Sequence, residues 1–135
     1  MYSKRYNPIK DKSAEIIEYL MDSPDMPKDD SLQFKLRLSI EETVENVCRY
    51  AYEGGVGWME VGTELESNGL VLKVVLRDAG VRFNPLEAAD PDLTLGAEER
   101  EIGGLGIFLC KQMMDDVDYK YEEGCNVLTM RKILK

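Results

Sequence analysis

Histidine is absent from this sequence of 135 residues. Its absence excludes phosphohistidine signalling, catalytic sites that use a histidine base, and metal sites that use imidazole ligands. Cysteine is scarce. The chain has three, which are widely spaced and form no Cys-x-x-Cys pair: Cys48, Cys110 and Cys125. This pattern predicts buried, reduced thiols in a cytoplasmic protein and argues against a disulfide framework or a zinc site.

Basic residues are outnumbered, with 17 Lys and Arg against 26 Asp and Glu and a net charge of −9. Nucleic acids and anionic lipid surfaces both attract Lys and Arg, so this charge argues against either as a partner. The opening residues 1–12 contain no apolar signal-like segment, and no hydrophobic run approaches the length of a membrane span. Any bound nucleotide must therefore be held by backbone amides and a metal ion.

The apolar residues make up 44% of the chain and the charged residues 32%, as in ordinary globular proteins. The length predicts one domain over residues 1–135. Periodicity and turn residues predict helices over 12–21, 31–52 and 107–114, a lid over 81–103, a weak edge strand in 1–8, and strands over 58–65, 70–77, 117–121 and 126–133. Tight hairpin turns are expected at Asn68-Gly69 and Glu123-Gly124. We expect an α+β fold, a two-layer α/β sandwich with a mixed, mainly antiparallel sheet and helices on one face.

The second predicted helix carries the first candidate residues. Glu42 and Asn46 lie four residues apart and therefore share one face, roughly opposite the apolar stripe of this helix. A carboxamide oxygen can ligate Mg²⁺, and a carboxylate one turn away can polarise a hydroxyl or a water beside bound phosphates. The ordinary alternative is a solvated helix face. The stripe consists of Ile40, Val44, Val47 and Ala51.

Asp78 and Gly80 follow the most apolar predicted strand. A carboxylate at a strand end can accept a hydrogen bond from an exocyclic amine such as N6 of adenine, and a glycine lets the backbone approach a ligand closely. A simple turn is the alternative, since Asp and Gly are both common turn residues.

The segment Gly103-Gly104-Leu105-Gly106 runs into the third predicted helix. Free backbone N–H groups at the positive end of a helix form a natural phosphate cradle. The alternative is a hinge that starts the helix. The segment is neither a P-loop nor a Rossmann fingerprint, because the chain has no GxxxxGK[ST] and GGLGIF has the wrong spacing.

Taken in order, these motifs resemble the GHKL (Bergerat-fold) ATP-binding superfamily, from its N-box through two glycine boxes. The resemblance covers about residues 13–135. The segment IGGLGIFLCKQMMDDVDYKYEEGCNVLTMRK and the Phe83-Asn84-Pro85 tripeptide are similar to the stand-alone anti-sigma-factor serine/threonine kinases of bacterial partner-switching systems.

The resemblance implies a role for each matching residue. Asn46 would coordinate the Mg²⁺ that bridges the ATP phosphates, and Glu42 would be the general base. Asp78 would bind the adenine amino group, with Gly80 letting the base lie close and Asn126 near the adenine end. The residues implied to bind ATP and Mg²⁺ are Asn46, Arg49, Asp78, Gly80, Phe83, Gly103, Gly104, Leu105, Gly106 and Asn126.

Proteins of this branch phosphorylate a serine of a small STAS-type antagonist and otherwise hold a sigma factor inactive as a homodimer. The chain departs from the pattern at Tyr50, where many members have His, and at Ile102, where some kinases have an Arg beside the γ-phosphate. Arg100 or Arg82 could supply that cation from the lid. Two alternatives stay open: a non-catalytic ATP-binding module that sequesters a partner, and a histidine-kinase catalytic fragment.

Overall fold

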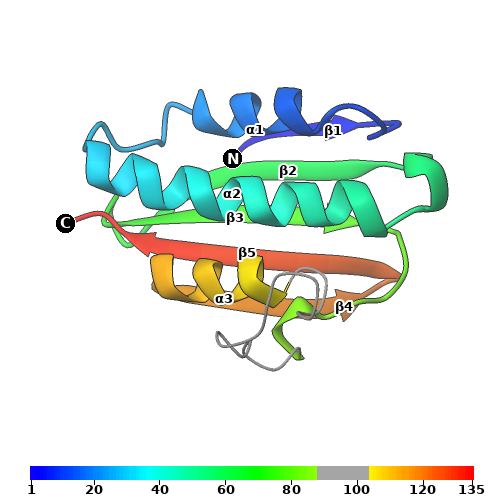
Figure 1. The fold of residues 1–135 in the computed structure, drawn as a ribbon. Helices are drawn as coiled ribbons and strands as arrows, with labels where there is room; N and C mark the ends of the chain where they lie inside the picture. Colours follow the sequence, from blue (N-terminus) through cyan, green and yellow to red (C-terminus); the bar gives the residue numbers. More distant parts are fainter. Residues whose placement is uncertain (88–103) are drawn as a thin grey trace.

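The structure is a computed structural model that describes residues 1–87 and 104–135 (Figure 1). The predicted order of elements is confirmed in these two ranges. The elements are β1 (Tyr2–Tyr6), α1 (Ser13–Met21), α2 (Asp30–Tyr50), the 3₁₀ turn η1 (Glu53–Gly55), β2 (Met59–Glu66), β3 (Val71–Asp78), the 3₁₀ turn η2 (Pro85–Glu87), α3 (Gly104–Met113), β4 (Asp116–Glu122) and β5 (Cys125–Ile133). The greater part of the predicted lid lies outside the described residues.

The five strands form one sheet in the order β1-β2-β3-β5-β4, with α1, α2 and α3 covering one of its faces (Figure 1). The predicted two-layer α+β architecture is confirmed. The sheet is more regular than the expected mixed arrangement, because every pairing between the described strands is antiparallel. The apolar strand β3 is central, with β2 on one side and β5 on the other.

Local sequence signals set the ends of several elements. Asn68-Gly69 and Glu123-Gly124 form the two predicted hairpin turns, and all four residues have the positive φ that such turns require. The carboxylate of Asp29 accepts a hydrogen bond from the backbone N–H of Leu32 (2.9 Å) and so caps α2. The N-cap residue of α1 is Lys12, whose side chain makes no capping hydrogen bond.

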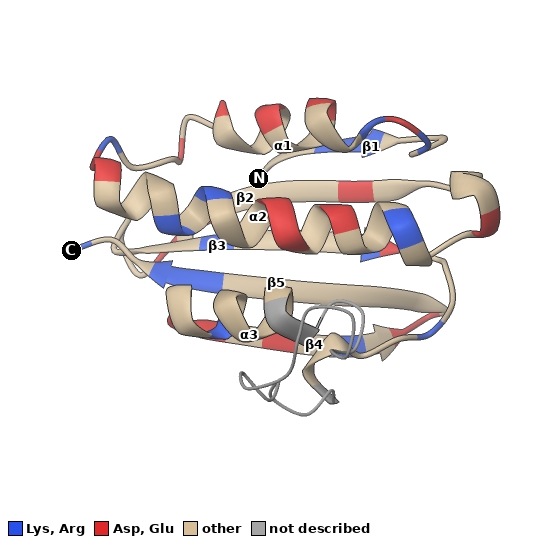
Figure 2. Cartoon of the chain, viewed as in Figure 1, with Lys and Arg blue, Asp and Glu red and all other residues tan. Residues whose placement is uncertain are grey.

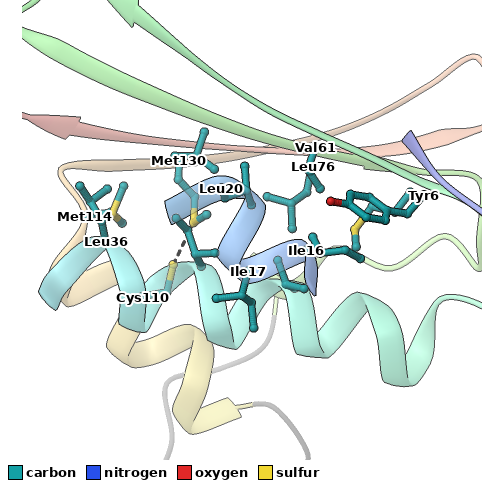
Figure 3. Packing of buried hydrophobic residues seen from close by; sticks show 14 of the residues in the cluster. Tyr6, Ile16, Ile17, Leu20, Leu36, Val61, Leu76, Cys110, Met114 and Met130 are labelled. Carbon is teal, nitrogen blue, oxygen red and sulfur yellow. Dashed lines mark hydrogen bonds between the residues drawn. The ribbon is translucent and has the colours of Figure 1, made fainter. Parts of the chain in front are cut away.

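The core lies between the helix layer and the sheet (Figure 3). Alternate residues of β3 point into it, and the apolar stripe of α2 faces it with Ile40 and Val44 fully buried. Cys110 and Cys125 are buried as predicted, whereas Cys48 is half-buried. Burial raises the pKa of the Cys110 thiol to about 11, so this thiol stays neutral at physiological pH.

The uncovered face of the sheet carries ion pairs that cross from strand to strand. Glu60 on β2 pairs with Arg5 on β1 and Arg77 on β3, both at 2.9 Å. Arg131 on β5 pairs with Glu66 on β2 at 2.9 Å. These side chains are partly exposed and alternate along their strands with core-facing residues, which explains how this face stands in water without a second helix layer. No described helix is both long and apolar enough to cross a membrane.

Acidic residues occur at several positions along α2 (Figure 2). The exposure of apolar residues near the start of this helix depends on which side they lie. Leu36 is 0% exposed and Phe34, two residues earlier, is 64% exposed. We expect Leu36→Ala to lower the free energy of unfolding by about 3 kcal/mol, because it leaves a cavity in the core. The control Phe34→Ala should change it by less than about 0.5 kcal/mol. Urea denaturation measures both, and equal effects would contradict this packing.

Candidate functional site

A pocket opens between the C-terminal half of α2, the end of β3, the middle of β4, the start of β5, the segment 81–85 and α3. Its empty volume of about 530 Å³ includes space open to solvent. Four predicted site residues meet there: Asn46, Asp78, Phe83 and Asn126. The full lining is Thr43, Asn46, Val47, Tyr50, Ala51, Leu76, Asp78, Val81, Phe83, Pro85, Ile107, Tyr119, Asn126 and Leu128.

Asp78 is the last residue of β3 and is only 4% exposed. Its Oδ1 accepts hydrogen bonds from the backbone N–H of Gly80 (2.8 Å) and from Nδ2 of Asn126 (3.0 Å). No described residue donates to Oδ2. Burial raises the pKa of Asp78, and the hydrogen bonds from Asn126 and Gly80 lower it in part. The free oxygen therefore makes this carboxylate a buried acceptor for a donor on a ligand.

Asn126 stands opposite Asp78 in the register of β3 and β5. Besides the bond to Asp78, its Nδ2 donates to the carbonyl of Val81 (3.0 Å), and its Oδ1 accepts from the backbone N–H of Phe83 (3.1 Å) and the hydroxyl of Tyr119 (2.5 Å). The structure places Asn126 at the pocket, as expected of a residue near an adenine. Its direct contact with a nucleotide stays a prediction.

Tyr52 holds the turn that follows Asp78. Its hydroxyl accepts a hydrogen bond from the backbone N–H of Ala79 (2.8 Å) and donates one to the carbonyl of Trp58 (2.6 Å). The N–H of Val81 donates to the carbonyl of Ala51 at the end of α2 (2.9 Å). Sequence reasoning missed Tyr52 and Tyr119, because only the folded register brings them to Asp78 and Asn126.

Gly80 has a packing role that its sequence position did not reveal. A Cβ at this position would overlap the backbone carbonyl of Ala51, which cannot swing away. The residue must therefore be glycine for the turn to lie against the end of α2. Its predicted role beside a nucleobase stays a prediction.

Glu42 and Asn46 lie on the side of α2 that faces α3 and the pocket. Both side chains are half-buried, and the neighbouring Ser39 and Thr43 are fully buried. Glu42 and Asn46 lie roughly opposite the apolar stripe, as their spacing predicts, but α3 packs against this side of the helix, so it is not the solvated face of the ordinary alternative. Asn46 lines the pocket, whereas the Glu42 carboxylate rests against Gly106 of α3.

The third helix begins earlier than predicted, within the glycine segment. α3 begins at Gly104 instead of residue 107, so Gly104, Leu105 and Gly106 form its first turn. The N-terminus of such a helix presents unpaired N–H groups and a positive dipole end, which favour anions. The predicted phosphate contacts of these three residues stay predictions, and Gly103 lies outside the described residues.

Other predicted residues are not brought into the pocket. The Arg49 side chain is largely exposed and pairs with Glu45 (3.5 Å) on the outer side of α2, away from the pocket lining. The Arg82 guanidinium lies 4.7 Å from the ring centre of Tyr121. Arg100 and Ile102 are outside the described residues. Tyr50, the departure from the family pattern, lines the pocket.

The described residues contain no cluster of three Cys, Asp or Glu that could hold a metal ion by itself. Mg²⁺ bound with a nucleotide does not require such a cluster, because phosphates and water supply most of its ligands. The amide of Asn46, a hard oxygen donor at the pocket, fits the single protein ligand that this arrangement needs.

The structure thus combines an antiparallel sheet, a helix layer on one of its faces and a pocket with a buried carboxylate. The sequence pattern of the histidine kinase-like ATPase domain matches residues 14–132, and the chain belongs to this family. The resemblance to GHKL (Bergerat-fold) proteins is thereby confirmed.

Two named relatives are serine-protein kinases. RsbW of Listeria monocytogenes is 31% identical over 106 residues, which cover 73% of this chain and 64% of the relative. RsbW of Bacillus thuringiensis is 28% identical over 100 residues, which cover 73% of this chain and 62% of the relative. The chain thus spans slightly less than two thirds of the length of these curated relatives.

Solved structures share the fold. The histidine kinase domain of a blue-light activated histidine kinase from Erythrobacter litoralis has a TM-score of 0.59 at 13% identity, with 99% of this chain and 69% of that chain covered. The catalytic domain of the histidine kinase ThkA has a TM-score of 0.52 at 10% identity, with coverage of 99% and 98%.

Two glycines at the site should respond differently to an added methyl group. A Cβ at Gly80 meets backbone, whereas a Cβ at Gly106 meets the end of the flexible Glu42 side chain. We expect Gly80→Ala to cost about 1–3 kcal/mol of unfolding free energy. Gly106→Ala should cost little, because Glu42 can move and alanine favours a helix. Thermal or urea unfolding tests the contrast, and an unaffected Gly80→Ala protein would refute the close approach.

Proposed function

We propose that this protein is an ATP-binding serine/threonine protein kinase of the anti-sigma-factor type. The observation that carries the proposal is Asp78, a buried pocket carboxylate with one oxygen fixed by the protein and the other left for a ligand. The N6 amino group of adenine is a donor of the right kind, and the apolar pocket walls suit a flat base. Family membership and the serine-kinase relatives support the proposal.

The other end of the pocket suits the phosphates. Asn46 lies about one turn before the end of α2 and lines the pocket. α3 opens with three residues that present backbone N–H groups. Phosphates bound there would meet the positive end of the α3 dipole. Asn46 would hold Mg²⁺, and the metal would supply positive charge against the transferred phosphoryl group. This accounts for nucleotide binding by a chain with a net charge of −9.

Glu42 is the proposed general base. It lies one helical turn from Asn46 and against the first turn of α3, so it borders the region assigned to the phosphates. In the proposed step, the carboxylate accepts the proton of a substrate serine hydroxyl, whose oxygen forms a bond to the γ-phosphorus. The bond from the γ-phosphorus to the bridging oxygen breaks, and ADP leaves with that oxygen.

The proposed partners follow the same assignment. The serine substrate would belong to a STAS-type antagonist, and a sigma factor or similar regulator would be sequestered by the protein, acting as a homodimer. The names of the relatives support a serine-protein substrate. We place the protein in the cytoplasm, and the free thiols of Cys48, Cys110 and Cys125 support a reducing compartment.

A second candidate function is ATP-dependent sequestration of a partner without phosphotransfer. It is favoured by the charge of the site: the described residues that line the pocket include no lysine or arginine. A cation against the developing phosphoryl charge can accelerate transfer by ~10³-fold or more. Without one, the pocket would retain ATP binding and lose most of its catalysis.

Asn46→Ala tests the phosphate end of the proposed site. Mg²⁺ should strengthen ATP binding to the wild-type protein, and this gain should fall roughly tenfold or more in the variant, because a metal ligand is lost. Binding measured without Mg²⁺ should change little. Calorimetric titration with and without the metal gives both numbers, and an unchanged Mg²⁺ effect would remove Asn46 from the site.

Glu42→Gln separates the kinase from the non-catalytic binder. Phosphotransfer to a STAS-type protein should fall by about 10²–10⁴-fold, because glutamine cannot accept the serine proton, while ATP affinity should be retained. The matched control is Glu45→Gln on the same helix, whose carboxylate pairs with exposed Arg49. Radiolabel transfer from ATP measures the rate. A wild-type rate in the Glu42 variant would exclude this residue as the base.

A further inference from the structure

Asn126 uses its whole side-chain amide on the protein itself. The group has two N–H donors and two oxygen lone pairs. The donors go to Asp78 Oδ1 and the Val81 carbonyl, each at 3.0 Å, and the oxygen accepts from the Phe83 N–H (3.1 Å) and the Tyr119 hydroxyl (2.5 Å). With all four positions filled and the residue 7% exposed, Asn126 has no hydrogen bond left for a ligand.

The partners also fix which way the amide points. A carboxylate such as that of Asp78 can only accept, so the nitrogen must lie on its side, and the backbone N–H of Phe83 can only donate, so the oxygen must lie on the other. A flipped amide would place its oxygen against the Asp78 carboxylate, another acceptor, and its nitrogen against the Phe83 N–H, another donor. The orientation is therefore dictated by the protein and independent of any ligand.

One residue thus joins three elements around the pocket. Asn126 on β5 holds the end of β3 through Asp78, the segment after β3 through Val81 and Phe83, and the edge strand β4 through Tyr119. The bond to Asp78 occupies Oδ1, which Gly80 N–H also contacts, and so leaves Oδ2 as the one oxygen open to a ligand.

We propose that Asn126 is a positioning residue that orients the Asp78 carboxylate toward the nucleobase and fixes the segment 80–83, without touching the nucleotide. This inference deepens the proposed function and rests on it. It replaces the direct nucleotide contact expected of Asn126 from the sequence. The amide acts through Asp78, so its loss should alter the properties of that carboxylate as well as the stability of the fold.

The loss of nucleotide affinity at low pH, called the acidic limb here, distinguishes a residue that positions Asp78 from one that only stabilises the fold. The hydrogen bond from Asn126 lowers the pKa of Asp78 against the effect of burial, so its removal should raise that pKa. Binding that needs the ionised carboxylate is lost as the pH falls through the Asp78 pKa, and in the variant the loss should begin at higher pH. The titratable groups beside Asp78 are Tyr50 from α2, Tyr52 after α2 and Tyr119 from β4. Burial raises the pKa of both Tyr52 and Tyr119, which keeps them neutral across the acidic range.

The experiment compares ADP affinity of the wild-type, Asn126→Leu and Thr129→Val proteins from acidic to neutral pH. Leucine keeps the branched shape of asparagine, with methyl groups in place of the amide oxygen and nitrogen, and removes its hydrogen bonds. Thr129 is an equally buried residue of β5 on the opposite face of the sheet, so its variant is the matched control. We expect Asn126→Leu to weaken ADP binding at neutral pH by about 10- to 100-fold and to shift the acidic limb upward, with Thr129→Val like the wild type.

A second experiment measures the pKa of Asp78 without ligand in the same proteins, from the NMR chemical shift of its carboxyl carbon as the pH changes. The pKa of Asp78 should be higher in Asn126→Leu than in the wild type. If that variant fails to fold, Tyr119→Phe, which frees one side of the amide, should shift the same pKa upward by a smaller amount. Wild-type affinity and an unmoved acidic limb in Asn126→Leu would overturn the positioning role alone. Absence of ADP binding by folded wild-type protein would overturn the proposed function, and an unchanged Asp78 pKa in Asn126→Leu would overturn the inference independently.

Discussion

The site depends on keeping a carboxylate buried at the end of the central strand. Asp78 is desolvated, which is unfavourable for a charge unless hydrogen bonds compensate for the lost water. Asn126 and the Gly80 N–H supply that compensation to one oxygen only. The turn after Asp78 is held by hydrogen bonds to the Tyr52 hydroxyl and to the Ala51 carbonyl at the end of α2. Only glycine at position 80 lets this turn lie so close to the backbone of Ala51. In the proposed function, this oxygen would be a preformed acceptor for a donor on the ligand.

The two ends of the pocket differ in how they are built. The end with Asp78 is held by hydrogen bonds between strands and turn, and its geometry needs no ligand. The other end combines Asn46 with the first turn of α3, where Glu42 rests against Gly106. In the proposed kinase, the base of ATP would be recognised at the rigid end, while the phosphates would be placed between two helices. A chain of strongly negative charge can bind a nucleotide in this way, because the attraction is local and comes from the helix dipole and a metal.

The sequence predicted most of the fold, because local signals set it. Asn68-Gly69 and Glu123-Gly124 require turns, and the apolar stripe of α2 requires a buried helix face. The candidate residues Asn46, Asp78, Phe83 and Asn126 also meet in one pocket. Periodicity could not show that α3 covers the side of α2 with Glu42, nor that Arg49 pairs with Glu45 outside the pocket. The roles of Tyr52 and Gly80 depend on contacts between segments distant in sequence, which no local pattern encodes.

The central claim is that Asp78 recognises an amino group on a purine. The most direct measurement compares the affinities of ATP and of inosine triphosphate, which carries an oxygen in place of that amino group, in the wild-type and Asp78→Asn proteins. The account predicts that the wild type binds ATP about tenfold or more tightly than inosine triphosphate, because the 6-oxo group and the Asp78 carboxylate are both hydrogen-bond acceptors. The preference should shrink in Asp78→Asn, because the amide of asparagine can donate a hydrogen bond to the 6-oxo group. Equal affinities of the wild type for the two nucleotides would contradict it.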